Sequence, residues 1–465
     1  MDSTAPLITG RRGQARSGVV LAVASGAAFL AMLDATVANL AVADLRHDFP
    51  GVAVGDLSWV ITIYAITFAA LLAPGGRLAD VVGRRALLAA GAALFTTMSI
   101  VAAAAPSLGV LLIARGLQGA GAAAMIPASL AVVLADTPPE RRAAAIGVWS
   151  AASALAAAAG PVLGGVLVDV AGWRSVFLIT IPAGLALMAG TQVLPMPGVR
   201  TGDRGRLPDL VGVALLAAGV GALALGVSRA EVWGWGDRRT LTCLAGGLLA
   251  LAVVLLRSRT HAAPAVEVGL WRSRMFALAN LASLIYGAVL FSWLLVGILY
   301  ITQVWGYSPL QAGLSVAPGA VIAAVVALRA GPVVARLGPR PVVVGGLLTV
   351  AGAAVWVRAA MGDDPAFLSL WLPISIPLGI GMGSVATGMS AAAALAVGPR
   401  QFAAGVGLNQ AARAVGGALG VAAMATILRG TDPGAAASYR GVYLMCTILL
   451  AAAAVASCGL KGATR

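Results

Sequence analysis

The sequence predicts an all-α polytopic membrane protein. Hydrophobic residues make up 60% of its 465 residues and charged residues only 10%, and the mean hydropathy is +0.96. Apolar runs of about 20 residues, the length at which a helix crosses a bilayer core, recur along the whole chain. Basic residues gather in alternate segments between these runs, as is typical of membrane proteins.

The apolar runs predict about fourteen spans, in two blocks of six with a pair between them. The first block is Val19–Ala43, Leu57–Gly75, Ala86–Ala105, Leu108–Leu134, Ala143–Val168 and Val176–Leu194. The inserted pair is Leu210–Val227 and Leu241–Leu256. The second block is Phe276–Thr302, Leu310–Leu328, Val342–Val357, Phe367–Leu395, Ala403–Leu428 and Val442–Leu460.

These spans divide the chain into five expected parts. They are a cytoplasmic N-terminal segment (1–18), an N-terminal six-helix bundle (19–195), two inserted transmembrane helices with linkers (196–260), a C-terminal six-helix bundle (261–460) and a cytoplasmic tail (461–465).

The basic residues predict the orientation. With the N-terminus inside, the inner segments hold 21 of the 31 lysines and arginines and the outer segments hold eight. We therefore expect a multi-pass protein of the cell membrane with both termini cytoplasmic. The net charge of +14 is spread over these topology markers rather than gathered on one face, which argues against nucleic-acid binding.

Several chemistries lack the residues they need. The only lysine, Lys461, is followed by glycine, so no phosphate-binding G-x-x-x-x-G-K-[ST] loop exists and ATP is not expected as a partner. The two histidines, His47 and His261, both fall in predicted loops, and the three cysteines have no C-x-x-C spacing. We expect no catalytic residues, no metal site and no cofactor, and hence no enzyme.

One short segment, residues 75–85, is charged and rich in glycine although its surroundings are apolar. It is predicted to be a cytoplasmic loop. Its spacing of Gly76, Asp80, Gly83, Arg84 and Arg85 resembles the motif between helices 2 and 3 of the major facilitator superfamily, a large family of secondary transporters. The resemblance implies transport.

In this segment Asp80 could cap a helix or pair with Arg84, Arg141 or Arg142, and such a charge cluster could latch two halves of the protein together. The alternative is that the charges only anchor the topology. The corresponding segment of the second half, residues 331–340, has Ala335 in place of the acid, so only the first copy is expected to act as a charged latch.

Further motifs resemble the fourteen-helix drug:proton antiporter branch of the same family, over nearly the entire chain. They are L-D-x-T-x-x-N at residues 33–39, R-x-x-Q-G-x-G at 115–121, G-P-x-x-G-G at 160–165 and W-R-x-x-F at 173–177. The resemblance implies the major facilitator fold, with two six-helix bundles plus two extra transmembrane helices. It also implies proton-coupled efflux of lipophilic drugs, antibiotics or secondary metabolites.

Asp34 is the only carboxylate well inside a predicted span. A central charge of this kind costs about 2.5–3.5 kcal/mol on insertion scales, so it should be paired, protonated or in contact with water. Arg115 lies at a similar depth and is the expected partner. The pair either couples transport to a proton or only fixes two helices together. Asn39 and Gln118 either line a polar cavity or hydrogen-bond between helices.

The glycines of the motif Gly160, Pro161, Gly164 and Gly165 let a neighbouring helix approach closely, and the proline permits a bend. We interpret the motif as a hinge or a tight seal. The resemblance implies that this helix packs against the second half and limits leak during exchange.

In the second half, Arg413 lies deep in a predicted span with no membrane acid near it in the sequence. It either receives anionic groups of a substrate or bonds to carbonyls and water within a helix-packing pattern. Asn409, Tyr64 and Gln303 are further candidates for substrate contact, although aromatic residues also form interfacial belts. Without a second acid in the spans, a neutral, monocationic or weakly anionic substrate fits better than a dication.

The function predicted by these features is proton-coupled export by alternating access between two bundles. The expected partners are a small lipophilic substrate, protons and membrane lipids. The alternatives are a facilitator or importer with the same fold, because scaffold motifs do not give direction, and a non-transporting membrane sensor.

Overall fold

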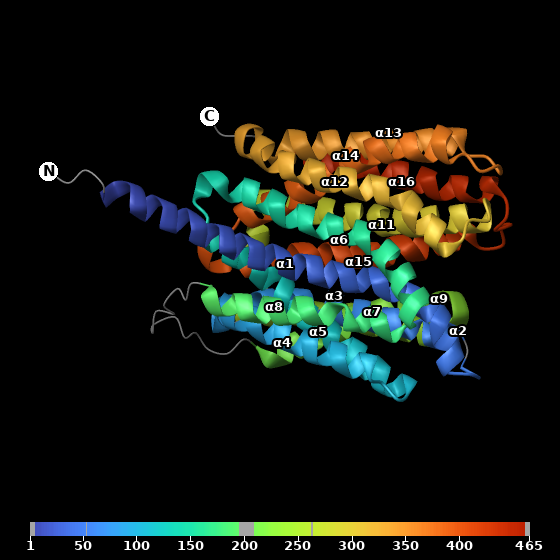
Figure 1. The fold of residues 1–465 in the computed structure, drawn as a ribbon, viewed down its shortest axis with the longest axis horizontal. Helices are drawn as coiled ribbons and strands as arrows, with labels where there is room; N and C mark the ends of the chain where they lie inside the picture. Colours follow the sequence, from blue (N-terminus) through green and yellow to red (C-terminus); the bar gives the residue numbers. More distant parts are fainter. Residues whose placement is uncertain (1–4, 53, 195–208, 262–263, 461–465) are drawn as a thin grey trace.

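The computed structural model describes residues 5–52, 54–194, 209–261 and 264–460, and these residues form helices without any strand (Figure 1). The first half comprises α1 (Ala5–Asp48), α2 (Val54–Leu57), α3 (Trp59–Val82), α4 (Arg84–Ala103), α5 (Leu108–Asp136), η1 (Pro139–Arg141), α6 (Arg142–Ala171), α7 (Arg174–Leu178) and α8 (Thr180–Val193). The inserted pair is α9 (Leu210–Trp233) and α10 (Arg238–Thr260). The second half comprises η2 (Val268–Arg272), α11 (Arg274–Gln303), α12 (Pro309–Leu337), α13 (Pro339–Ala360), η3 (Phe367–Trp371), α14 (Leu372–Leu395), η4 (Pro399–Gln401), α15 (Phe402–Leu428) and α16 (Ala436–Ser457).

Within the described residues, 14 helices are long and apolar enough to cross a membrane by length and composition. This confirms the predicted fold class. Figure 1 shows them running side by side along the long axis, with α3, α4, α5 and α8 on one side and α12, α13, α14 and α16 on the other. Some predicted topology markers, namely Arg200, Arg204, Arg206, Lys461 and Arg465, lie outside the described residues.

Successive spans run in opposite directions, so the bundle has two ends, which we call the Gly83 end and the Trp173 end. At the Gly83 end, the prediction of a loop over residues 75–85 was wrong. Helix α3 continues to Val82 and α4 begins at Arg84, with only Gly83 between them at a φ of 114°, a conformation that favours glycine. Gly75 and Gly76 stay helical because they pack against neighbouring helices rather than form a turn.

The two halves touch along pairs of helices at positions without side chains. An added Cβ at Gly76 would overlap the carbonyl oxygen of Ala403, which brings α3 close to α15 near the Gly83 end. In the same way, an added Cβ at Gly331 on α12 would overlap the carbonyl of Ala143 on α6. Small residues at helix contacts give close van der Waals packing, which is a main source of helix association in lipid.

At the Trp173 end, the W-R-x-x-F motif joins α7 to the end of α1. The backbone N–H of Trp173 donates to Asp44 Oδ2 over 2.8 Å, and its indole Nε1 donates to Asp48 Oδ2 over 3.1 Å. Arg174 also pairs with Asp48, and this hydrogen bond lowers the pKa of the Asp48 carboxyl. The pair therefore stabilises the fold above about pH 4, and this contribution is lost as the pH falls further.

The inserted helices pack on one another, and α9 also packs against α3 and α15. Asp209 accepts a hydrogen bond from the N–H of Gly212 over 3.0 Å and so caps the start of α9. The same carboxylate pairs with Arg257 at the end of α10. The ion pair therefore fastens the beginning and the end of the insert to each other at the Gly83 end.

Candidate functional site

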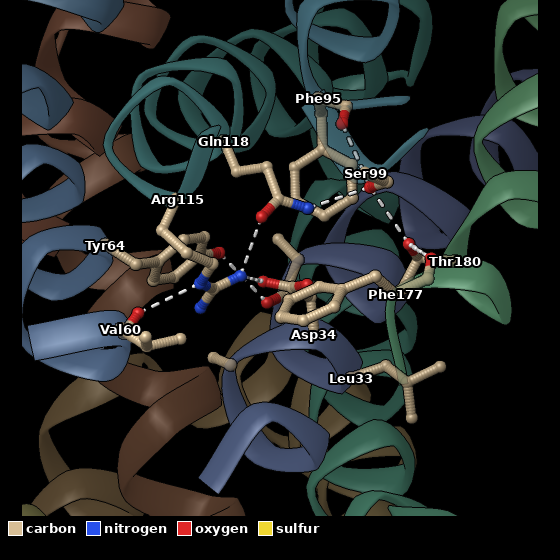
Figure 2. Close-up of polar contacts among 12 residues, drawn as sticks. Leu33, Asp34, Val60, Tyr64, Phe95, Ser99, Arg115, Gln118, Phe177 and Thr180 are labelled. Atoms are coloured by element: carbon tan, nitrogen blue, oxygen red, sulfur yellow. Dashed lines mark hydrogen bonds and ion pairs between the residues drawn. The ribbon is translucent and has the colours of Figure 1, made fainter. Parts of the chain in front are cut away.

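A buried ion pair connects α1 and α5 in the first half (Figure 2). Arg115 Nη1 lies 2.8 Å from Asp34 Oδ2, and both residues are fully buried. The structure thus brings together the two charges that the sequence places at similar depth. In an apolar interior, a pair of this kind is stable only if the remaining donors and acceptors are also satisfied.

Arg115 is held from several sides. Its Nε donates to the carbonyl of Val60 over 3.0 Å, and Nη1 also donates to Gln118 Oε1 over 2.9 Å. The guanidinium lies over the rings of Tyr64, at 4.4 Å, and Phe177, at 5.5 Å. Hydrogen bonds and aromatic faces on three helices therefore fix its position.

Gln118 is itself oriented by residues that the sequence did not single out. Its Nε2 donates to Ser99 Oγ on α4 over 2.8 Å, and Ser99 Oγ lies 3.0 Å from the hydroxyl of Thr180 on α8. Of the two interpretations of Gln118, the interhelical hydrogen bond is the one observed. Because the amide nitrogen is engaged by Ser99, the amide oxygen is left to accept from Arg115.

The Asp34 carboxylate is satisfied on one oxygen only. Oδ2 binds Arg115, whereas Oδ1 is buried and has no hydrogen-bond partner among the described residues. A buried unpaired oxygen costs about 1–3 kcal/mol, and more when it carries charge. This oxygen can accept a proton or a donor group of a ligand without breaking an existing hydrogen bond.

Two residues proposed for the cavity lie away from this pair. Asn39 is exposed, and its amide donates to Ala35 of its own helix over 3.3 Å. Among the described residues its amide makes no hydrogen bond to another helix, so the interhelical alternative is not what the structure shows, and a place in a cavity stays a prediction. Gln303 lies exposed at the end of α11. Tyr64 faces Arg115 rather than open space, and its hydroxyl donates to the carbonyl of Ala31 over 3.3 Å.

At the Gly83 end, Asp80 connects the two halves. It pairs with Arg84 at 2.8 Å, and its carboxylate accepts from the backbone N–H of Ala404 over 2.8 Å and of Ala403 over 3.3 Å. Both expected roles of Asp80, pairing with Arg84 and capping a helix, are therefore present together. The capped helix is α15, which belongs to the other half, and its N-terminal dipole favours a negative charge.

The arginines of this motif differ in what they bind. Arg84 also donates to the carbonyl of Pro399, in the other half. Arg85 stays within the first half, where it donates to the carbonyls of Leu194 over 3.0 Å and Gln192 over 2.9 Å. Arg142, a sequence-based alternative for Asp80, lies over the ring of Phe402 at 5.0 Å.

A second connection at the Gly83 end was missed by the sequence analysis. Glu267, between α10 and α11, pairs with Arg77 of α3 through atoms 2.6 Å apart. Its other oxygen accepts from Gln401 Nε2 at the start of α15 over 3.2 Å. The partners are far apart in the sequence, so no local pattern could have indicated this connection.

The G-P-x-x-G-G motif lies in the second half of α6 and faces two neighbours. Added Cβ atoms at Gly160 and Gly164 would collide with Thr36 and Leu40 of α1, within the same half. Gly165 and Pro161 face α12, as shown by the close approach of Gly313 to the proline. The helix packs against the second half, as expected, but two of its three glycines serve contact with α1.

The second half holds another intramembrane arginine. Arg413 lies on α15, over the ring of Tyr286 at 5.8 Å, and Nη2 reaches Ser390 Oγ on α14 at 3.5 Å. Asn409, one turn earlier, donates to Ser283 of α11 over 2.8 Å and is buried. The expected helix packing is present, because an added Cβ at Gly416 would overlap α11 backbone.

Comparison with known proteins relates the chain to transporters. Residues 24–205 match the family model described as Major Facilitator Superfamily. The chain is 35% identical to the cephamycin export protein CmcT of Amycolatopsis lactamdurans, over 94% of this chain and 90% of that protein. It is 35% identical to the puromycin resistance protein pur8 of Streptomyces alboniger (90% and 82%). It is 31% identical to the multidrug resistance protein Stp of Mycobacterium tuberculosis (89% and 76%).

Solved structures share the fold at low sequence identity. The proton:xylose symporter XylE, bound to 6-bromo-6-deoxy-D-glucose, superposes with a TM-score of 0.65 at 15% identity, covering 95% of each chain. The human organic anion transporter MFSD10 superposes with a TM-score of 0.64 at 17% identity, covering 93% of this chain and 99% of that one. At these identities the likeness concerns the fold alone.

Proposed function

The chain belongs to the major facilitator superfamily of membrane transporters, and from this premise we propose that it exports lipophilic drugs, antibiotics or secondary metabolites in exchange for protons. It is a multi-pass transporter and not an enzyme. Export is supported by the relatives, whose names describe export of an antibiotic or resistance to drugs.

The observation that carries the proton-coupled part of the proposal is the half-satisfied Asp34 carboxylate. Its free oxygen Oδ1 can take a proton, which would neutralise the carboxylate and weaken its attraction to Arg115. Arg115 would stay in place, because Val60, Gln118 and two aromatic rings hold it. A proton at Asp34 thereby frees α1 from α5, and its release draws the helices together again.

Alternating access then requires the α3–α15 contact to open and close. We assign this contact to the cytoplasmic side, since the basic residues place the Gly83 end there. Asp80, Arg84 and the start of α15 form a charged latch that favours the closed contact. Lipid would surround the outer surface, where large apolar side chains are exposed on many helices.

We expect Asp80→Asn to weaken the latch. The change removes the charge that faces the α15 N-terminus and Arg84, while the amide oxygen can still accept one hydrogen bond. Transport should fall about tenfold, corresponding to about 1.4 kcal/mol, with normal expression. Initial export rates in inverted vesicles measure the effect. Glu140→Gln, at an exposed acid of the same end, is the control and should leave the rate unchanged.

The direction of transport is tested by drug accumulation in cells that lack their own exporters. Export predicts that expression of the chain lowers the steady-state content of puromycin or a cephamycin and raises resistance. A higher content would indicate the importer or facilitator instead. An unchanged content for every compound would favour the membrane sensor and contradict the proposal.

A further inference from the structure

Arg115 and Arg413, which both lie inside spans predicted from the sequence, have very different surroundings in the structure. Arg115 has a carboxylate, an amide oxygen and a backbone carbonyl as acceptors, each within 3.0 Å. The single hydrogen bond observed for Arg413 among the described residues is the 3.5 Å contact with a serine hydroxyl, at the limit for such a bond. Its Nε is buried without a partner there.

This arginine lies at the middle of its span, Pro399–Leu428. Arginine keeps its charge in proteins, and placing that charge at the centre of a membrane helix is costly unless an anion or several dipoles compensate it. Over the described residues, the structure contains no ion pair to Arg413 and no carbonyl that accepts from it. The interpretation that it bonds to backbone carbonyls is therefore not what the structure shows.

The surroundings of Arg413 are those of an incomplete binding site. Gln410, one turn earlier on α15, has a buried amide oxygen that is also without a partner in the described part of the chain. Tyr286 supplies an aromatic face from α11, and Ser390 supplies a hydroxyl from α14. The side chains of Arg413 and Gln410 both remain partly exposed, although Arg413 Nε and the Gln410 amide oxygen are themselves buried.

We propose that Arg413 binds the anionic group of the exported compound, so that the preferred substrates carry a carboxylate next to an aromatic or otherwise apolar body. The guanidinium would donate through its Nε and one terminal nitrogen to the two carboxylate oxygens, and this forked geometry satisfies the unpartnered Nε. The proposal rests on the proposed export function and names its substrate class.

The position of Arg413 also connects substrate to the latch. The helix that carries it, α15, receives Asp80 at its N-terminus and packs against α3 along its first turns. An anion bound to Arg413 therefore acts on α15, the same helix whose N-terminus is held by Asp80. Substrate binding and opening at the Gly83 end are thereby coupled through one helix.

The test compares acids with their neutral amides. Purified protein in nanodiscs is titrated with dansylglycine and with dansylglycinamide, which differ only in the carboxylate, followed by further aromatic acid and amide pairs. We expect the acids to bind about 10- to 100-fold more tightly than the amides, as hydrogen bonds between charged groups would produce. Arg413→Gln should abolish the difference, and Arg413→Lys should retain part of it.

Arg440→Gln is the matched control, since Arg440 lies on α16 and donates to the carbonyl of Met361. It should leave the preference for acids intact. Equal binding of acids and amides by the unaltered protein would overturn the proposal that Arg413 binds a carboxylate. If the protein still exports the amides in that case, the proposed export function stands although the carboxylate proposal fails. If the unaltered protein neither binds nor exports any pair, the export function fails as well.

A separate observation concerns the inserted helices. Ala265 and Val266, which precede Glu267, are both buried, and Val266 belongs to an apolar cluster with residues of α3, α9 and α10. From this anchored segment the Glu267 carboxylate reaches Arg77 in the first half and Gln401 in the second. Both Glu267 and Arg77 are largely buried, with side-chain exposures of 16% and 17%.

We infer that Glu267 is a clamp by which the α9–α10 insert holds the α3–α15 contact closed. Opening this contact separates Arg77 from Gln401, so one of the two Glu267 interactions must break. The Asp209–Arg257 pair joins the two ends of the insert to each other. We therefore expect the insert to keep its position when either half moves. The two extra helices thereby bias the conformational equilibrium of the transporter.

Spin labels at Val82→Cys and Gly398→Cys, both exposed at the Gly83 end, report the distance between α3 and the start of α15 when the native cysteines are replaced by serine. Glu267→Gln should lower the ratio of closed to open protein about two- to tenfold, as expected for the loss of one partly buried ion pair. Glu140→Gln should leave the ratio unchanged. An unchanged distance distribution in Glu267→Gln would overturn the inference.

Discussion

Arg115→Gln is expected to lower the free energy of unfolding by about 3–5 kcal/mol and to abolish transport. The change leaves the Asp34 carboxylate in the interior without its counter-charge, and removing one partner of a buried pair carries a cost of this size. It also removes the donors to Val60 and Gln118. Reversible denaturation in mixed micelles measures the loss of stability.

The double variant Asp34→Asn with Arg115→Gln separates stability from function. Without any buried charge, it should regain most of the lost stability, and the double-mutant cycle should give a favourable coupling energy between the two residues. Proton-coupled transport should remain absent. The control is again Arg440→Gln, which leaves both properties unchanged. A loss of under about 1 kcal/mol in Arg115→Gln would contradict the assigned importance of the pair.

Gly76→Leu is expected to force apart the helices that join the two halves. The new side chain would overlap the backbone of α15 at Ala403, and overpacking of this kind typically costs about 1–3 kcal/mol. If this cost destabilises only the closed state of the α3–α15 contact, the ratio of closed to open protein drops about 5- to 150-fold. Export should fall accordingly, because the α3–α15 contact at the Gly83 end closes less often during the transport cycle.

The Val82 and Gly398 spin labels would show a longer distance in this variant. Gly345→Leu on α13 is the matched control, since an added Cβ there meets nothing within 4 Å. That control should leave the distance and the export rate unchanged. A Gly76→Leu protein with an unaltered distance and rate would show that the close approach of α3 and α15 does not matter for transport.

The sequence predicts the membrane fold well because its signals are local. Long apolar runs give each helix, and 14 helices of sufficient length are present in the described residues. The Asp34–Arg115 pair was also predictable, since two charges at similar depth in an apolar medium have few other partners. These conclusions need no knowledge of how distant helices pack.

Other features depend on packing between distant segments, which composition does not reveal. Residues 75–85 have the composition of a loop, yet contact with α5 and α15 keeps Gly75 and Gly76 helical. Ser99 was missed because a hydroxyl in an apolar helix has no local signal until Gln118 faces it. Glu267 was missed because both its partners lie more than a hundred residues away.

The proton-coupled mechanism depends on Asp34 as the group that takes up and releases the proton. Protein reconstituted in liposomes, loaded with a pH-sensitive dye, reports proton movement when an exported compound is added. The unaltered protein should show substrate-driven proton flux, and Asp34→Asn should show none while it still binds the compound. Asp169→Asn, at an exposed acid of α6, should behave as the unaltered protein does. Proton flux that survives in Asp34→Asn would contradict the mechanism.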